Sequence, residues 1–118
     1  MIEKNLKISS LLDFYGDFLT VNQRKVLALY YNEDLSLSEI ADNQGITRQG
    51  VRDAIKKAEL QLLDMEEKLN LYRKFTSLQN NLLSIIKNAS EIEDISTNKN
   101  IFNLAKIIKE TAINLYEQ

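Results

Sequence analysis

Hydrophobic residues recur at helical spacing along most of the chain, and polar stretches divide them into successive helices. Residues 3–19 form the first predicted helix, which Gly16 interrupts near its end. The apolar positions that predict its buried face are Leu6, Leu11, Leu12, Phe14, Tyr15, Phe18 and Leu19. Thr20 and Gln23 are spaced as a capping box, which predicts a second helix from Val21 to about Asn32. Its expected core positions are Val26, Leu27, Tyr30 and Tyr31.

A short helix, a glycine bend and a longer helix come next. Ser36 and Glu39 are spaced as another capping box, so the short helix is expected to run from residue 37 to about residue 43. Gly45 can adopt the left-handed conformation that ends helices, and Thr47 can cap the helix that follows. This order of signals predicts a helix-turn-helix. The residues expected to build it are Ser36, Glu39, Ile40, Ala41, Gly45, Thr47, Val51 and Ile55.

The second helix of this motif carries the candidate binding residues. With Val51 and Ile55 facing inward, the side chains left outward are Arg48, Gln49, Arg52, Asp53, Lys56 and Lys57. Arg and Gln near the start of a helix suit guanine and adenine edges in the major groove, and the two lysines suit phosphates. The pattern favours DNA binding over the alternative of a merely solvated helix face.

The same helix is expected to continue without interruption, because no helix breaker follows Lys57 until well beyond residue 74. Its apolar positions alternate in steps of four and three residues, namely Val51, Ile55, Ala58, Leu62, Met65, Leu69 and Tyr72. Such a heptad seam either pairs with a second chain or packs against the C-terminal helices of its own chain. We favour a homodimer through residues 58–115.

The C-terminal third is also helix-periodic. Apolar residues continue from Phe75 to Ala89, and Ser90 with Glu93 is spaced to cap a short helical turn through Ile95. Residues 96–100 are polar and predict a loop. The final predicted helix carries Ile101, Leu104, Ala105, Ile108, Ala112 and Leu115 on one side. We therefore divide the chain into a helix-turn-helix domain, residues 1–75, and a segment, residues 76–118, that packs on the long helix or on a second protomer.

Composition narrows the class of protein further. The 118 residues include no proline and only three glycines, which with the helical periodicity predicts an all-α fold. Without cysteine or histidine, disulfides, thiolate zinc sites and the commonest general base are excluded. No nucleophile–base pair, phosphate loop or metal-ligand spacing is present, so we expect neither an enzyme nor a cofactor. No run is apolar for long enough to span a membrane, which favours a cytoplasmic protein.

Charge is unevenly distributed. The net charge is −2, whereas DNA-binding domains are usually basic. Residues 47–75, however, carry seven Lys or Arg against five Asp or Glu. We expect nonspecific DNA affinity to be weak and strongly salt-dependent.

The N-terminal half resembles the YlxM family of bacteria. The resemblance rests on the segment 12–16, on Leu19-Thr20 and Gln23, on the segment 29–31, and on Asp34, Ser36-Leu37 and 39–41. It covers roughly residues 3–75. That family consists of small proteins described as DNA-binding and as associated with the signal recognition particle. The resemblance implies a role in protein targeting, with a component of that particle as partner.

Residues 20–63 more distantly resemble region 4 of sigma-70 factors, which reads a promoter element through its recognition helix. Carried across, Arg48, Gln49, Arg52 and Asp53 fall on positions that contact bases or phosphates. Gln49 stands where sigma factors usually have Glu, which suits adenine better than cytosine. Gly50 replaces a common Arg and costs about 1 kcal/mol of helix propensity. Asp53 replaces a Gln and brings negative charge toward the phosphates.

Two functions follow from these features. The first is a dimeric DNA-binding regulator that presents Arg48–Lys57 to the major groove. The alternative is a helical adaptor that does not bind DNA but binds a protein or ribonucleoprotein partner of the targeting pathway. The acidic balance, Asp53 and the apolar C-terminal half motivate this alternative.

Overall fold

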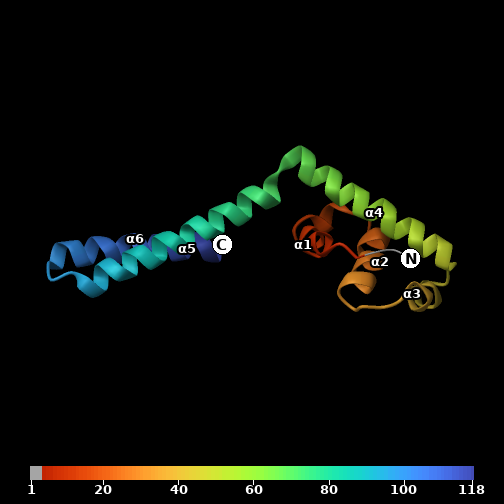
Figure 1. The fold of residues 1–118 in the computed structure, drawn as a ribbon, viewed down its shortest axis with the longest axis horizontal. Coiled ribbons are helices and arrows are strands. Elements are labelled where there is room, and N and C mark those ends of the chain that lie inside the picture. The colour runs from red at the N-terminus through yellow and green to blue at the C-terminus, as the bar shows by residue number, and fades with distance from the viewer. Residues whose placement is uncertain (1–3) are drawn as a thin grey trace. The chain divides into compact units, whose positions relative to one another are not determined.

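A computed structural model describes residues 4–118 and contains no strand within that range (Figure 1). The all-α fold class predicted from the sequence is confirmed. The elements are α1 (Leu6–Tyr15), the short 3-10 helix η1 (Gly16–Phe18), α2 (Val21–Tyr31), α3 (Leu37–Gln44), α4 (Arg48–Leu69), α5 (Leu71–Ile95) and α6 (Lys99–Glu117). They form two compact units, which divide between Tyr72 and Arg73.

The first helix is shorter than its apolar pattern predicted. Asn5 caps it by accepting a hydrogen bond from the backbone N–H of Lys7, so α1 begins at Leu6. Residue 3, where the predicted segment began, lies outside the described residues. The capping box of α2 is present, because the side chains of Thr20 and Gln23 each accept a hydrogen bond of 3.1 Å from the other residue's backbone N–H.

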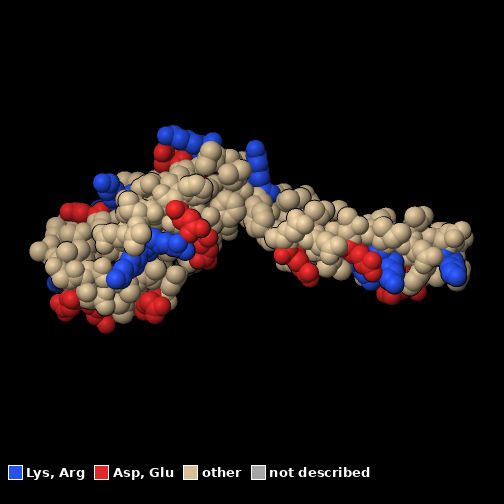
Figure 2. All heavy atoms as spheres, turned by 180° about the vertical axis from the view of Figure 1, so that it is seen from behind, with Lys and Arg blue, Asp and Glu red and all other residues tan. Residues whose placement is uncertain are grey.

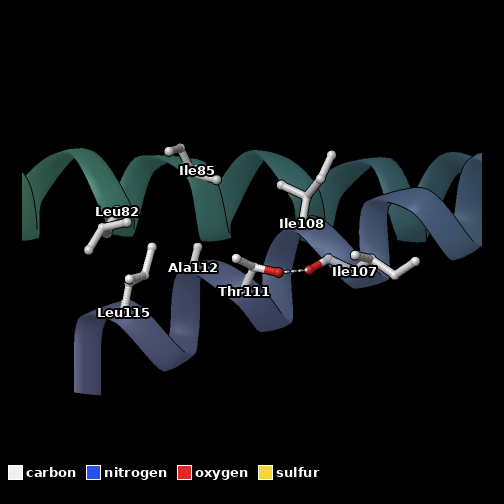
Figure 3. Close-up of a pocket in the computed structure, with 7 residues that line it drawn as sticks. All are labelled: Leu82, Ile85, Ile107, Ile108, Thr111, Ala112 and Leu115. Carbon is white, nitrogen blue, oxygen red and sulfur yellow. Dashed lines mark hydrogen bonds between the residues drawn. The ribbon is translucent and has the colours of Figure 1, made fainter. Parts of the chain in front are cut away.

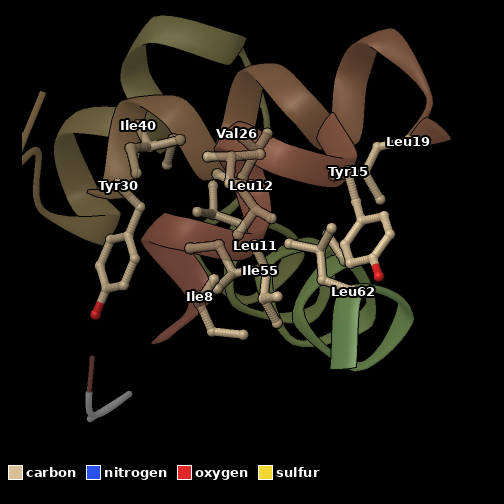
Figure 4. Packing of buried hydrophobic residues seen from close by; sticks show 14 residues of the cluster. Ile8, Leu11, Leu12, Tyr15, Leu19, Val26, Tyr30, Ile40, Ile55 and Leu62 are labelled. Atoms are coloured by element: carbon tan, nitrogen blue, oxygen red, sulfur yellow. The ribbon is translucent and has the colours of Figure 1, made fainter. Parts of the chain in front are cut away.

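The core of the N-terminal unit lies where α1, α2 and α3 pack against α4 (Figure 4). Its fully buried aliphatic side chains are Ile8, Leu11, Val26, Leu27, Ile40, Val51, Ile55 and Leu62. Burying one such side chain contributes about 1.5–3 kcal/mol. The core is therefore assembled from α1, α2, α3 and α4.

Two residues assigned to the buried face of the first helix are instead exposed. Leu6 is 86% exposed and Phe18 is 71% exposed, whereas Ile8, which was not among the predicted positions, is fully buried. The buried face of α1 is set by Ile8, Leu11, Leu12 and Tyr15. Leu6 lies two residues before Ile8 and so points away from this face. Phe18 lies in η1, where the α-helical periodicity no longer applies.

The sequence predicted that the long helix continues without interruption past residue 69. In the structure α4 ends at Leu69. Asn70 adopts a left-handed conformation with φ of 55°, and its N–H donates to the carbonyl of Glu66. Asn is the residue that most often replaces Gly in this conformation. The carboxylate of Glu66 accepts a hydrogen bond of 3.0 Å from the backbone N–H of Tyr72 in the first turn of α5. The break is therefore capped on both sides.

The heptad seam of α4 is covered by the N-terminal helices of its own chain. Val51, Ile55, Ala58 and Leu62 are all fully buried against α1, α2 and α3. Leu69, the last seam position on α4, is exposed. The prediction that this seam pairs with a second chain or with the C-terminal helices is wrong for residues 51–62, because the N-terminal helices already fill that face.

The C-terminal unit is an antiparallel hairpin of α5 and α6 (Figure 1). Ser90 lies inside the continuous α5, so the predicted separate turn at Ser90 is wrong. The connecting loop is shorter than predicted, because the side chain of Asn98 accepts from the N–H groups of residues 100 and 101 and starts α6 at Lys99. Lys109 forms an ion pair of 2.8 Å with Glu93 across the hairpin.

Candidate nucleic-acid interface

The short helix α3 is closed at both ends by its own residues. The hydroxyl of Ser36 accepts a hydrogen bond of 3.1 Å from the N–H of Glu39, and the Glu39 carboxylate accepts one of 3.0 Å from the N–H of Ser36. The hydrogen bond that the Ser36 N–H donates to the carboxylate lowers the pKa of Glu39, and the Ser36 side chain adds to this effect. At the other end Gly45 is left-handed, with φ of 68°, and its N–H donates to the carbonyl of Ala41. The bend that leads into α4 is thus fixed locally.

The start of α4 is fixed by Thr47 and Gly50. The hydroxyl of Thr47 accepts a hydrogen bond of 3.0 Å from the N–H of Gly50. A Cβ atom at position 50 would lie 3.1 Å from that hydroxyl oxygen, which is tighter than an ordinary contact. The glycine therefore leaves room for the cap, a reason for its presence that helix propensity did not suggest.

The inner faces of α3 and α4 hold the two helices in place. Ile40, Val51 and Ile55 are fully buried, and Ala41 is nearly so. Leu35, which precedes the capping box, is half-buried and packs against the same core. The outer face of α4 is consequently fixed relative to α3 by close packing rather than by a flexible loop.

The six candidate binding residues lie on the outer part of the first three turns of α4. Arg52 is half-buried, and the other five, Arg48, Gln49, Asp53, Lys56 and Lys57, are exposed. Within residues 4–118, the structure gives Arg48 and Arg52 no hydrogen bond or ion pair. Both guanidinium groups are therefore available to a ligand.

Gln49 and Asp53 contact each other, which the sequence reading missed. The side-chain amide of Gln49 donates a hydrogen bond of 2.9 Å to the carboxylate of Asp53. The spacing of four residues is the signal that could have revealed this pair, since such residues are neighbours on a helix surface. One amide hydrogen and the carbonyl oxygen of Gln49 remain for an external partner.

The charge of this surface is locally positive. From Arg48 to Lys57 there are four cationic side chains and one carboxylate, at the end of the helix where the dipole also favours anions. Elsewhere on the N-terminal unit, Arg24 is paired with Asp17 at 2.6 Å, and Lys4 is paired with Asp34. Figure 2 shows a face on which Lys and Arg of this unit alternate with Asp and Glu. The start of α4 therefore has an excess of positive charge, whereas the cations Arg24 and Lys4 elsewhere on the unit are paired with carboxylates.

Two titratable groups lie beside this surface. Partial burial raises the pKa of Glu59, and a hydrogen bond from Tyr31 and the charge of Lys56 offset part of that effect. Burial also raises the pKa of Tyr31 to about 12. The hydroxyl of Tyr31 accepts a hydrogen bond of 3.4 Å from the N–H of Asn5 and so joins the N-terminal segment to α2.

Between residues 4 and 118 no group of acidic side chains is arranged to hold a metal ion. None of the helices described is both long enough and apolar enough to cross a membrane.

The capped short helix, the glycine bend and the exposed face of α4 define a helix-turn-helix protein. A family model described as "Putative helix-turn-helix protein, YlxM / p13 like" matches residues 2–104. The chain belongs to this family, UPF0122.

Individual relatives match over nearly their whole length. A UPF0122 protein of Clostridium kluyveri is 42% identical over 106 residues, which is 90% of this chain and 93% of the relative. One of Clostridium novyi is 42% identical over 113 residues, 95% of this chain and 97% of the relative. One of Bacillus cereus is 42% identical over 96 residues, 81% of this chain and 87% of the relative. The family recognised from the N-terminal motifs is thereby confirmed.

Proposed function

We propose that this protein is a cytoplasmic, non-enzymatic regulator that binds DNA by inserting the start of α4 into the major groove. The observation that carries the proposal is the pair of unpartnered, accessible guanidinium groups of Arg48 and Arg52 on a helix held by a rigid bend. Membership of a helix-turn-helix family supports the same function. So does the resemblance of this segment to region 4 of sigma-70 factors.

Each outward residue has a distinct role in this proposal. Arg48 and Gln49, in the first turn, read base edges, and Arg52 reads a base or holds the adjacent phosphate. Lys56 and Lys57, one turn further on, contact phosphates and position the helix. Asp53 holds the amide of Gln49 and repels phosphates that come close, so it restricts the sequences that are accepted.

DNA selection with the purified chain tests this function. Genomic fragments are selected at low salt, and fluorescence anisotropy then measures the affinity of a selected duplex. Replacing both Arg48 and Arg52 with Ala is expected to weaken binding by about 2–6 kcal/mol, since each well-placed base contact contributes about 1–3 kcal/mol. The charge-matched control replaces Lys87 and Lys106, both exposed on the hairpin, with Ala and is expected to keep most of the affinity. Equal affinity of the Arg48, Arg52 variant and wild type would refute the assignment of α4.

We also propose that the protein acts as a homodimer, so that each protomer presents one α4 to the DNA. Two half-sites are then separated by roughly 34 Å or a multiple of it. Selected sequences are expected to contain an inverted repeat at that spacing. A single, unrepeated half-site in the selected pool would contradict the dimeric arrangement.

A second candidate function is that of an adaptor for a component of the signal recognition particle pathway. The resemblance to the YlxM family supports it, and so does the large exposed apolar surface of α5 and α6, which is typical of protein-binding surfaces. Co-purification from a native host separates the two functions. Capture of the particle's GTPase or RNA–protein core that survives DNase and moderate salt supports the adaptor. Loss of all partners after DNase supports DNA binding.

A further inference from the structure

The α5–α6 hairpin buries very little of its own apolar surface. Within residues 73–118 the buried residues are Leu82, Ala89, Ala105 and Ala112, and three of these four are alanines. Helices of this length receive most of their stability from packing of an apolar face, and a contact made mainly by alanines supplies little of it. The hairpin therefore needs a further surface to pack against.

Each helix of the hairpin carries two apolar rows with a spacing of seven residues. On α5 the row of Leu82 and Ala89 is buried toward α6, and the adjacent row is Leu78, Ile85 and Ile92. On α6 the row of Ala105 and Ala112 is buried toward α5, and the adjacent row is Ile101, Ile108 and Leu115. The residues of the two adjacent rows are 40–55% exposed. Each helix thus has one apolar row that is buried and one that is exposed. This pattern is typical of a helix that packs against two neighbouring helices.

The two uncovered rows border one groove, shown in Figure 3. Ile85 from α5 and Ile108 and Leu115 from α6 line a hollow of about 260 Å³ together with the buried Leu82 and Ala112. No charged residue lines it, and the hydroxyl of its one polar lining residue, Thr111, already donates to the carbonyl of Ile107 at 2.8 Å. We call this surface, with the two uncovered rows, the hairpin groove. It offers an apolar strip without an unsatisfied polar group in its lining.

We propose that the hairpin groove binds the same groove of a second copy of the chain and forms an antiparallel four-helix bundle. This inference rests on the homodimer of the proposed function and names its surface. The contacts between the two chains are made by α5 and α6. The heptad seam of α4 takes no part in them, because its own chain already fills it.

Area and charge both fit a second copy. The two rows and the flanking Leu104 and Ile107 are eight large aliphatic residues, each 40–61% exposed. Each partner contributes about 800 Å² to a standard interface, and an apolar strip along both helices offers a surface for a contact of that kind. Residues 73–118 carry six Lys or Arg and five Asp or Glu, so two copies do not repel each other by net charge. An isologous contact also requires a surface complementary to itself, and two aliphatic rows that can interdigitate satisfy this condition.

The oligomeric state of the full chain tests the inference without any DNA. Sedimentation velocity at micromolar concentrations is expected to show a dimer for wild type. Ile85→Glu and Ile108→Glu each place a carboxylate in the dry centre of the groove, once per protomer, and are expected to weaken dimerisation about a hundredfold or more. The matched controls are Leu60→Glu and Leu69→Glu, which introduce the same charge at exposed leucines of α4 and are expected to remain dimeric.

Cross-linking keeps the inference testable if a Glu variant fails to fold. The chain has no cysteine, so Ile85→Cys and Ile108→Cys each introduce a single thiol. A bismaleimide is expected to join two chains at either position in high yield and to leave Leu60→Cys monomeric. A monomeric wild type, a dimer that persists in Ile85→Glu, or a dimer lost in Leu69→Glu would each overturn the groove assignment. A dimer of the expected kind that selects no DNA would refute the proposed function alone and leave this surface standing.

Discussion

The hydroxyl of Tyr15 donates a buried hydrogen bond of 2.7 Å to the carboxylate of Glu66, which joins the end of α1 to the last turns of α4. The same carboxylate oxygen accepts from the N–H of Tyr72 and so caps the start of α5. Phe14 packs edge-on against the rings of both Tyr15 and Tyr72. The buried side chain of Glu66 thus links α1, α4 and the start of α5, beside an aromatic cluster.

Removing the hydroxyl of Tyr15 is expected to destabilise the N-terminal unit. Tyr15→Phe leaves the buried Glu66 carboxylate with one donor fewer, which costs about 1–3 kcal/mol. Urea unfolding followed by circular dichroism measures the change. Tyr116→Phe removes a hydroxyl from an exposed tyrosine and is expected to change the unfolding free energy by less than about 0.5 kcal/mol. Equal stability of Tyr15→Phe and wild type would show that this hydrogen bond is not a structural link.

Ionisation of Tyr31 is expected to weaken the fold at high pH. The pKa of Tyr31 is about 12 in the folded chain, against about 10 in an unfolded one. Because the folded-state value is the higher, the stability is fully present below pH ~10 and is lost as the pH rises from there toward ~12. Tyrosinate absorbance, recorded alongside circular dichroism, measures both events. Tyr31→Phe is expected to flatten the loss of stability across this window, and an unchanged profile would contradict the assignment.

Gly45 is expected to tolerate Asn better than Ala. A Cβ at this position meets no atom within 4 Å, so the cost comes from the left-handed backbone and not from crowding. Gly45→Ala is expected to lower the unfolding free energy by about 1–2 kcal/mol, and Gly45→Asn by less. Thermal or urea denaturation compares the pair. If the two variants were equally destabilised, backbone conformation could not be the cause.

Asp53→Asn is expected to raise DNA affinity if α4 enters the groove as proposed. The change removes the one carboxylate among the four cations between Arg48 and Lys57, and about 1 kcal/mol, or roughly fivefold, is expected at low salt. Asp64→Asn, later on the same helix and paired with Lys68 at 3.0 Å, serves as the charge-matched control. A fall in affinity for Asp53→Asn would instead mean that the carboxylate contacts a base or is needed to orient Gln49.

The helix starts were predictable because their signals are local. Each of the hydroxyls of Thr20, Ser36 and Thr47 accepts a hydrogen bond from the backbone N–H of the third residue after it. This spacing is visible in the sequence. The helix break at Asn70 was not predictable in the same way. Asn is a weaker stop signal than Gly, and the group that completes the break, the Glu66 carboxylate, is held by Tyr15 from another helix. Tertiary contacts decided this boundary.

The apolar periodicity predicted which faces are buried, but not which element covers them. Val51, Ile55, Ala58 and Leu62 form a regular heptad seam, yet a seam has the same pattern whether a second chain or the N-terminal helices fill it. Similarly, the sequence placed Gln49 and Asp53 among the outward residues without showing that they bond to each other. Contacts between residues remote in sequence, and choices among equivalent partners, need the folded chain.

The covered face of α4 has a consequence for how such proteins can diversify. Because the N-terminal unit completes its own hydrophobic core, amino-acid changes in the α5–α6 hairpin need not disturb α4, the helix that we propose binds DNA. Changes in the hairpin can then alter how two chains associate without altering the outward face of α4. Changes on that face can likewise alter DNA recognition without altering how the chains associate.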